Sequence, residues 1–121
     1  MNILKFWRLP FVQTEVKPAE QQVGKLKLSD AIRIGAKIRP QCFGYLFKNG
    51  GSCALGAAFE GLYGYPLPEG SGFDTALMDK GGEWFYFIHP SYEIFDEIVR
   101  RNDQYGQTRE QIADYLESIG R

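Results

Sequence analysis

Gly50-Gly51-Ser52-Cys53-Ala54-Leu55-Gly56-Ala57-Ala58-Phe59 is the stretch of sequence that decides the fold. A serine after two glycines is typical of a helix start, because its hydroxyl can accept a hydrogen bond from a free N–H of the first turn. Gly56 and Gly61 each cost about 1 kcal/mol relative to alanine inside a helix. A chain accepts this cost where another backbone approaches closely. We therefore predict a buried helix over residues 52–63, with its neighbours packed tightly on a face of Ala54, Ala57, Ala58 and Gly61.

The two glycines before this helix also invite comparison with a phosphate-binding loop. Such a loop follows a strand and carries a Lys-Ser/Thr pair after its glycines. Here the only nearby lysine, Lys48, precedes them. We therefore favour a turn at Asn49-Gly50-Gly51.

Three further helices are expected. Ser29 is predicted to cap a helix over residues 30–38, with Ala31, Ile34, Gly35 and Ile38 on its buried face and Pro40 ending it. A second follows Ser91 over residues 92–104. The third spans 109–119 and begins with a capping box, because the Thr108 hydroxyl and the Gln111 side chain can each bond the other's backbone N–H.

A small β element is expected to accompany these helices. Residues 43–47 alternate aromatic side chains, and residues 84–88, Trp-Phe-Tyr-Phe-Ile, read as a short strand or a buried bridge. Residues 64–82, with five glycines and two prolines, are the least regular stretch and are predicted to form a flap or a loose excursion. The predicted fold is mainly α: a single-domain bundle of about four helices at 26–121, preceded by an apolar arm and linker at 1–25.

Composition restricts the classes of partner. The 121 residues fit one domain, and the formal net charge of −1 gives no global field that favours nucleic acid. No apolar run approaches the ~20 residues that span a bilayer. Two cysteines, Cys42 and Cys53, do not form a disulfide framework, so we expect reduced thiols in a cytoplasmic protein.

Several motifs together resemble those of a family of small uncharacterised bacterial, phage or gene-cassette proteins. The resemblance rests on Leu28-Ser29-Asp30-Ala31-Ile32-Arg33-Ile34-Gly35-Ala36, Pro40-Gln41-Cys42-Phe43-Gly44, Gly51-Ser52-Cys53-Ala54-Leu55-Gly56-Ala57-Ala58, Asn102-Asp103 and Thr108-Arg109-Glu110-Gln111-Ile112-Ala113-Asp114. It implies a helical core and a mobile-element context, and it transfers no activity. Relatives often carry a cysteine-bearing insert before the Asn-Asp pair, but this chain has no cysteine after Cys53.

Few residues offer catalytic chemistry. Cys53 at a helix start would have a lowered thiol pKa and could pair with His89, but no third group orients such a pair; we expect Cys53 to be a small buried hydrophobe. The cysteine and histidine spacing does not suit structural zinc. We therefore lean away from an enzyme and expect no catalytic residue, cofactor or metal.

Three other features are interpreted as structural. Asn102-Asp103 is expected to have a cap-and-turn role, with Asp103 either accepting from loop N–H groups or lying near the positive end of the next helix. Glu60 is placed on the solvated edge of the central helix, since buried charges are rare unless paired. Residues 108–119 resemble the first helix of a helix-turn-helix unit, but the sequence has no recognition helix after it, so we do not expect DNA binding.

The predicted function is a non-catalytic binding or interaction protein that self-associates, with a homodimer as the expected assembly. The apolar arm would supply the contact through Ile3, Phe6, Trp7 and Phe11, although docking of the arm on its own core is the alternative. The runner-up is a protein that binds a small apolar ligand in an aromatic pocket under residues 64–82. This pocket would be lined by Phe43, Tyr45, Phe47, Trp84, Tyr86 and His89.

Overall fold

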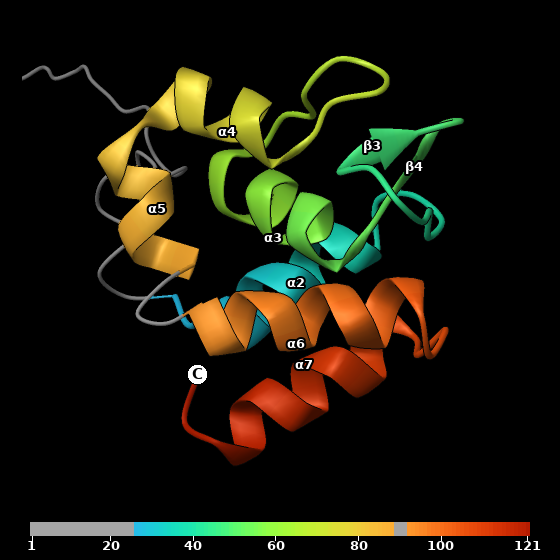
Figure 1. The fold of residues 1–121 in the computed structure, drawn as a ribbon, viewed down its shortest axis with the longest axis vertical. Helices are drawn as coiled ribbons and strands as arrows, with labels where there is room; N and C mark the ends of the chain where they lie inside the picture. Colours follow the sequence, from blue (N-terminus) through green and yellow to red (C-terminus); the bar gives the residue numbers. More distant parts are fainter. Residues whose placement is uncertain (1–25, 89–91) are drawn as a thin grey trace, which may run out of the picture.

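The chain is organised around helix α3 (Ala54–Tyr63), which lies in the middle of the fold (Figure 1). The structure is a computed structural model and describes residues 26–88 and 92–121. Five other helices lie within those residues: α2 (Leu28–Ala36), α4 (Phe73–Lys80), α5 (Gly82–Ile88), α6 (Tyr92–Asp103) and α7 (Arg109–Ser118). The mainly α prediction is confirmed, but its four helices are too few.

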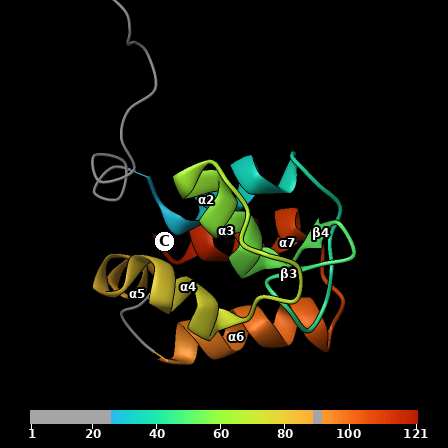
Figure 2. The ribbon, with the colours of Figure 1, turned by 90° about the horizontal axis from the view of Figure 1, so that it is seen from above.

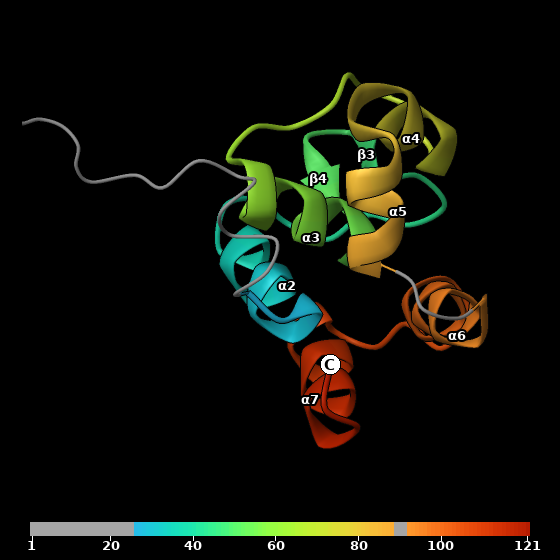
Figure 3. The same ribbon diagram turned by 90° about the vertical axis from the view of Figure 1, so that its left-hand side faces the viewer.

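A view from above and a view from the side show how these helices surround α3. Helix α2 lies on one side of α3, and the α4–α5 pair lies on the other (Figures 2 and 3). Helix α7 packs against α2, while α6 contacts both α3 and α7. Almost every residue of α3 is buried, as the sequence predicts for a central helix.

Glycine allows α3 to approach its neighbours backbone to backbone. A Cβ atom added at Gly61 would overlap the carbonyl oxygen of Ala31, and one at Gly35 of α2 would overlap that of Ala57. At Gly56 the overlap would be with the carbonyl oxygen of Leu46. The prediction that Gly56 and Gly61 mark a close approach is therefore confirmed.

The start of α3 differs from the prediction by two residues. Its N-cap is Cys53, whose sulfur accepts from the Gly56 N–H at 3.4 Å. Ser52 instead belongs to strand β4 (Gly51–Ser52), which pairs antiparallel with β3 (Phe47–Lys48). Asn49 and Gly50 have positive φ values of 54° and 75° in the connecting turn, so the predicted turn is confirmed.

Helix α2 begins earlier than predicted. It starts at Leu28 rather than at residue 30, and the Ser29 hydroxyl donates to the backbone carbonyl of Arg121 instead of capping the helix. The buried face therefore follows 28, 31, 32 and 35 in the same helical spacing, which leaves Ile34 and Ile38 exposed. The predicted face of 31, 34, 35 and 38 is therefore wrong at Ile34 and Ile38, because the buried stripe of the helix starts one turn earlier, at Leu28.

A small β element is present, as predicted, but most of its predicted residues are not in strands: of residues 43–47 only Phe47 belongs to one. Strand β3 begins at the end of the predicted 43–47 segment, whereas residues 84–88 form helix α5 rather than a strand. In α5, Trp84 and Ile88 point inward four residues apart, and Tyr86 between them is exposed. A short run of consecutive apolar residues fits either period, so the sequence alone did not decide between them.

Residues 64–82 are more regular than predicted, because they contain α4. The Gly72 N–H donates to the Thr75 hydroxyl at 3.3 Å at the start of that helix. Within α4 only Ala76 is buried, so the helix has almost no apolar stripe that could identify it in the sequence.

The last two helices agree with the sequence within one residue at their C-terminal ends. The capping box of α7 is present, with the Thr108 N–H donating to Gln111 and the Gln111 N–H donating back to Thr108. Ile112, Ala113 and Leu116 are buried beneath it, as is Ile98 of α6.

Candidate functional site

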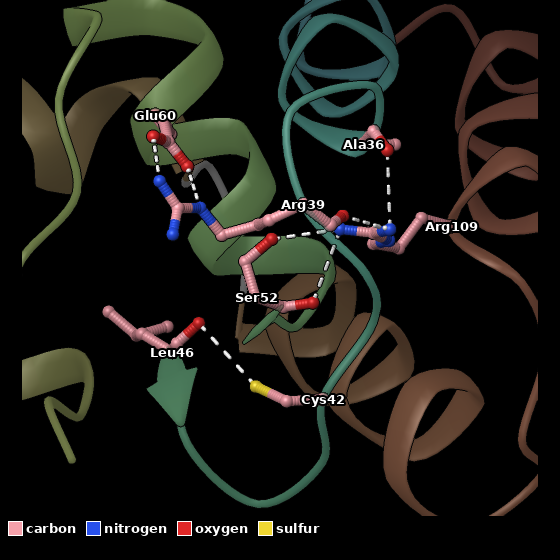
Figure 4. A network of polar contacts seen from close by, with 7 residues as sticks. All are labelled: Ala36, Arg39, Cys42, Leu46, Ser52, Glu60 and Arg109. Atoms are coloured by element: carbon pink, nitrogen blue, oxygen red, sulfur yellow. Dashed lines mark hydrogen bonds and ion pairs between the residues drawn. The ribbon is translucent and has the colours of Figure 1, made fainter. Parts of the chain in front are cut away.

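A buried ion pair joins α3 to the loop that follows α2. The Arg39 guanidinium donates from Nε and Nη2 to the two carboxylate oxygens of Glu60, each at 2.7 Å (Figure 4). Glu60 is only 4% exposed, so its predicted position on a solvated edge is wrong. A paired carboxylate can be buried at this depth because the bidentate partner replaces its water.

A second arginine, Arg109, fastens the start of α7 to three other segments. Its guanidinium donates to the Ser52 hydroxyl at 2.8 Å and to the carbonyl oxygens of Ser52, Ala36 and Arg39 (Figure 4). Burial lowers the pKa of this guanidinium, and no carboxylate of the described residues forms an ion pair with it. All four of these hydrogen bonds go to groups of the fold, which gives Arg109 a structural role.

Asn102 is the third polar group that holds the core together. Its side-chain oxygen accepts from the Ala54 N–H at 3.0 Å and from Gln41 at 2.8 Å, and its amide donates to the Cys42 carbonyl. Next to it, Asp103 accepts from the Gly44 N–H at 3.1 Å, so the predicted bond to a loop N–H is confirmed, whereas Asn102 is buried in the core rather than placed in a turn. The pair links the end of α6 to the start of α3 and to the loop before β3.

The two thiols are held in environments that suppress their reactivity. Burial raises the pKa of the Cys53 thiol to about 12, opposite to the lowering that a helix start alone would give. Burial also raises the pKa of Cys42, whose sulfur lies 3.4 Å from the Tyr45 carbonyl oxygen. His89 lies outside the described residues.

An apolar cleft is the clearest place for a ligand. It has a volume of about 170 Å³ and lies between the loop before β3, the first turn of α3, the start of α4 and one face of α6. Its lining residues are mostly apolar: Gly44, Tyr45, Leu46, Cys53, Leu55, Gly72, Phe73, Phe95, Val99 and Asp103. Asp103 is the one charged residue among them, so the cleft suits an apolar group that carries a positive charge nearby.

Of the six aromatic-pocket residues that the sequence selects, the structure describes five, and it does not bring them together in one pocket. Tyr45 lines the cleft, and Phe43 is exposed two residues before it in the same loop. Phe47 is buried, and Trp84 is buried against Phe59 of α3. Tyr86 is 76% exposed on the outer face of α5.

The sequence missed most of the cleft. Leu55, Phe73, Phe95 and Val99 are ordinary apolar residues of three different helices, and only their three-dimensional packing brings them together. One signal was available: the predicted pocket lay under residues 64–82, and Gly72 and Phe73 of that segment do line the cleft.

The structure bears on the remaining predictions only within the residues that it describes. Ile3, Phe6, Trp7 and Phe11, the predicted self-association residues, lie outside them. Across residues 26–88 and 92–121, no three His, Cys, Asp or Glu side chains gather in a way that could hold a metal ion. In that same part of the chain, none of the helices has the length and apolar character needed to cross a bilayer.

The chain was compared with known proteins in three ways. No protein-family model, no curated protein and no solved structure matches it. The interpretation of the site therefore rests on its residues and their geometry.

Proposed function

We propose that this protein is a non-catalytic binding protein that self-associates. The observation that carries the proposal is the apolar cleft beside the exposed side chains of Phe43 and Tyr45. Aromatic side chains that are part apolar and part accessible are enriched where proteins bind one another. The core around the cleft is tied together by Asn102 and Arg109, so the cleft is held by a rigid frame.

The sequence supplies an apolar surface that a second copy could use. Ile3, Phe6, Trp7 and Phe11 lie within twelve residues that contain no acidic side chain. Apolar side chains of this number need a surface to cover them, either on their own domain or on a partner. We propose the partner to be a second copy of the chain, located in the cytoplasm, as expected from the two unpaired cysteines.

Light scattering coupled to gel filtration tests self-association on the full chain. We expect a mass of about twice 13.8 kDa that falls toward the monomer on dilution. A variant with serine at positions 3, 6, 7 and 11 should remain monomeric at concentrations where the wild type is a dimer. A wild-type mass equal to one chain at every concentration would refute the proposal.

A second candidate function is the binding of a small apolar molecule in the same cleft. It is favoured by the cleft volume, because an engineered cavity of about 150 Å³ holds one benzene molecule. A thermal-shift screen of single-ring aromatic compounds tests it, since a ligand of the native state raises the unfolding midpoint. No stabilising compound among the set would count against this candidate.

The resemblance of residues 28–119 to mobile-element proteins supports a further part of the proposal. We propose that the gene belongs to a phage or gene-cassette context, for which the motifs at residues 28–36 and 51–58 are the support. Sequencing the flanking DNA for recombination sites tests this directly.

A further inference from the structure

We propose that the cleft is the docking site for residues 1–12 of a second copy of this chain. The inference rests on the proposed self-association and names where the contact is made. In such an assembly each copy offers one apolar segment and one cleft, so reciprocal docking closes a twofold dimer.

The shape of the cleft suits one aromatic side chain. Its walls are formed by Leu46, Leu55, Phe73, Phe95 and Val99, and its volume is about 170 Å³. A cavity of roughly 150 Å³ accommodates a six-membered ring. Phe6 and Trp7 in residues 1–12 carry aromatic rings, and moving such a ring from water into an apolar cleft is favourable.

The acidic side chains on and next to the lining residues favour this segment as the partner. A basic group also lies near: Lys48 Nζ is 5.0 Å from the centre of the Tyr45 ring. Asp103 lines the cleft, while Asp74 and Asp96 directly follow the lining residues Phe73 and Phe95. All three aspartates are exposed, and none forms an ion pair with another described residue. In residues 1–12 the only charged side chains are Lys5 and Arg8, which stand on either side of Phe6-Trp7.

The same complementarity holds for the two parts of the chain as a whole. Residues 1–25 contain four basic and two acidic side chains, whereas residues 26–121 contain ten basic and thirteen acidic ones. Opposite net charges steer the two surfaces together and fix the register of the contact.

Residues 13–25, which link the segment to the domain, are long enough for residues 1–12 to reach the cleft of a second copy. Residues 13–25 could span roughly 45 Å if fully extended. A domain of about 100 residues has a radius of gyration of about 13 Å, so a cleft on an adjacent copy is within range.

A charge-exchange experiment on the full chain tests the proposal. The variant Asp74→Lys/Asp96→Lys reverses two exposed charges on the residues that directly follow the lining residues Phe73 and Phe95. The variant Lys5→Glu/Arg8→Glu reverses the two charges in the segment. We expect each double variant to raise the dimer Kd at least about tenfold, because like charges then face each other. Combining all four substitutions should restore most of the wild-type affinity.

A matched control changes the same number of charges elsewhere. Glu110→Lys/Asp114→Lys lies on α7, none of whose residues lines the cleft. Both carboxylates pair with Arg33, so circular dichroism checks that this variant keeps the fold. We expect its Kd to stay within about threefold of the wild type. An equal loss in this control, or a four-residue variant as weak as either parent, would overturn the charge pairing on which the proposal depends.

A second measurement reports on the cleft itself. The methyl NMR signals of Leu55 and Val99 should shift between the wild type and Phe6→Ala/Trp7→Ala. If the dimer is lost in that variant while these signals stay unchanged, the segment docks elsewhere: the inference fails and self-association stands. If the wild type is monomeric and the signals still shift, the segment docks within its own chain, which overturns the second copy as partner and the proposed function together.

Discussion

At the scale of single residues, the buried pair of Arg39 and Glu60 shows what a sequence hides. Glu60 has only small and apolar neighbours in sequence and no nearby basic residue to pair with, so the local sequence predicts an exposed position for it. Its partner stands twenty-one positions earlier in a loop. Nothing local to Glu60 indicates that arginine, because the contact depends on how α3 sits beside the end of α2.

This pair leads to a prediction on stability. Arg39→Met should lower the free energy of unfolding by about 2–4 kcal/mol, because it leaves a buried carboxylate without its partner. Replacing both residues, as Arg39→Met/Glu60→Leu, should recover much of that loss. Chemical denaturation followed by circular dichroism measures both.

The control is Arg33 of α2, which contacts the exposed carboxylates of Asp114 and Glu117. Arg33→Met should cost clearly less than Arg39→Met, because exposed ion pairs are screened by water. Equal losses in the two variants would mean that burial does not decide the strength of these pairs.

At the scale of elements, length and spacing separate the successful predictions from the failed ones. Helices α6 and α7 carry apolar stripes over ten or more residues, and α7 also has its capping box, so both could be placed from sequence. Helix α5 is seven residues of almost continuous apolar character, which fits a strand equally well. Helix α4 buries one residue and gives no periodic signal.

The interlock of α2 and α3 leads to the second prediction. Gly35→Ala and Gly61→Ala should each destabilise the protein by at least about 1–3 kcal/mol, because the added methyl group meets a backbone carbonyl that cannot rotate away. Helix propensity alone would favour alanine at both positions by about 1 kcal/mol. Thermal or urea unfolding of the two variants measures the outcome.

Gly82→Ala is the matched control, since it makes the same change at the first residue of α5. A methyl group there would lie 3.7 Å from the Tyr86 ring, which is an ordinary contact. We expect this variant to be as stable as the wild type or slightly more stable. If Gly61→Ala were equally harmless, the close packing of α2 on α3 would be wrong.

At the scale of the whole molecule, Arg109 connects segments that are far apart in sequence. Helix α2, the loop that follows it, strand β4 and α7 all meet at its guanidinium. The sequence places Arg109 correctly at the start of a helix but gives no sign of its burial. The cleft could not be predicted either, because its walls come from separate helices. The arrangement of those helices follows from the fold and not from any local sequence pattern.

The third prediction concerns this junction. Arg109→Lys should lower the free energy of unfolding by about 2–4 kcal/mol, because an ammonium group cannot reach four acceptors arranged for a planar guanidinium. Arg100→Lys on α6 is the control: its partly exposed side chain bonds Glu97, and we expect a change within about 0.5 kcal/mol. Comparable urea midpoints for the two variants would contradict the clamping role of Arg109.

The glycines at 35, 56 and 61 also restrict how the sequence can change during evolution. Each faces a backbone carbonyl group of a neighbouring segment, in α2, α3 or the loop before β3. Substitutions at these three positions should therefore be selected against, while surface positions around them can change. Their intervals of twenty-one and five residues form a fingerprint that depends on backbone geometry alone. Distant homologues of this chain should keep these three glycines at the same spacing even where their other side chains differ.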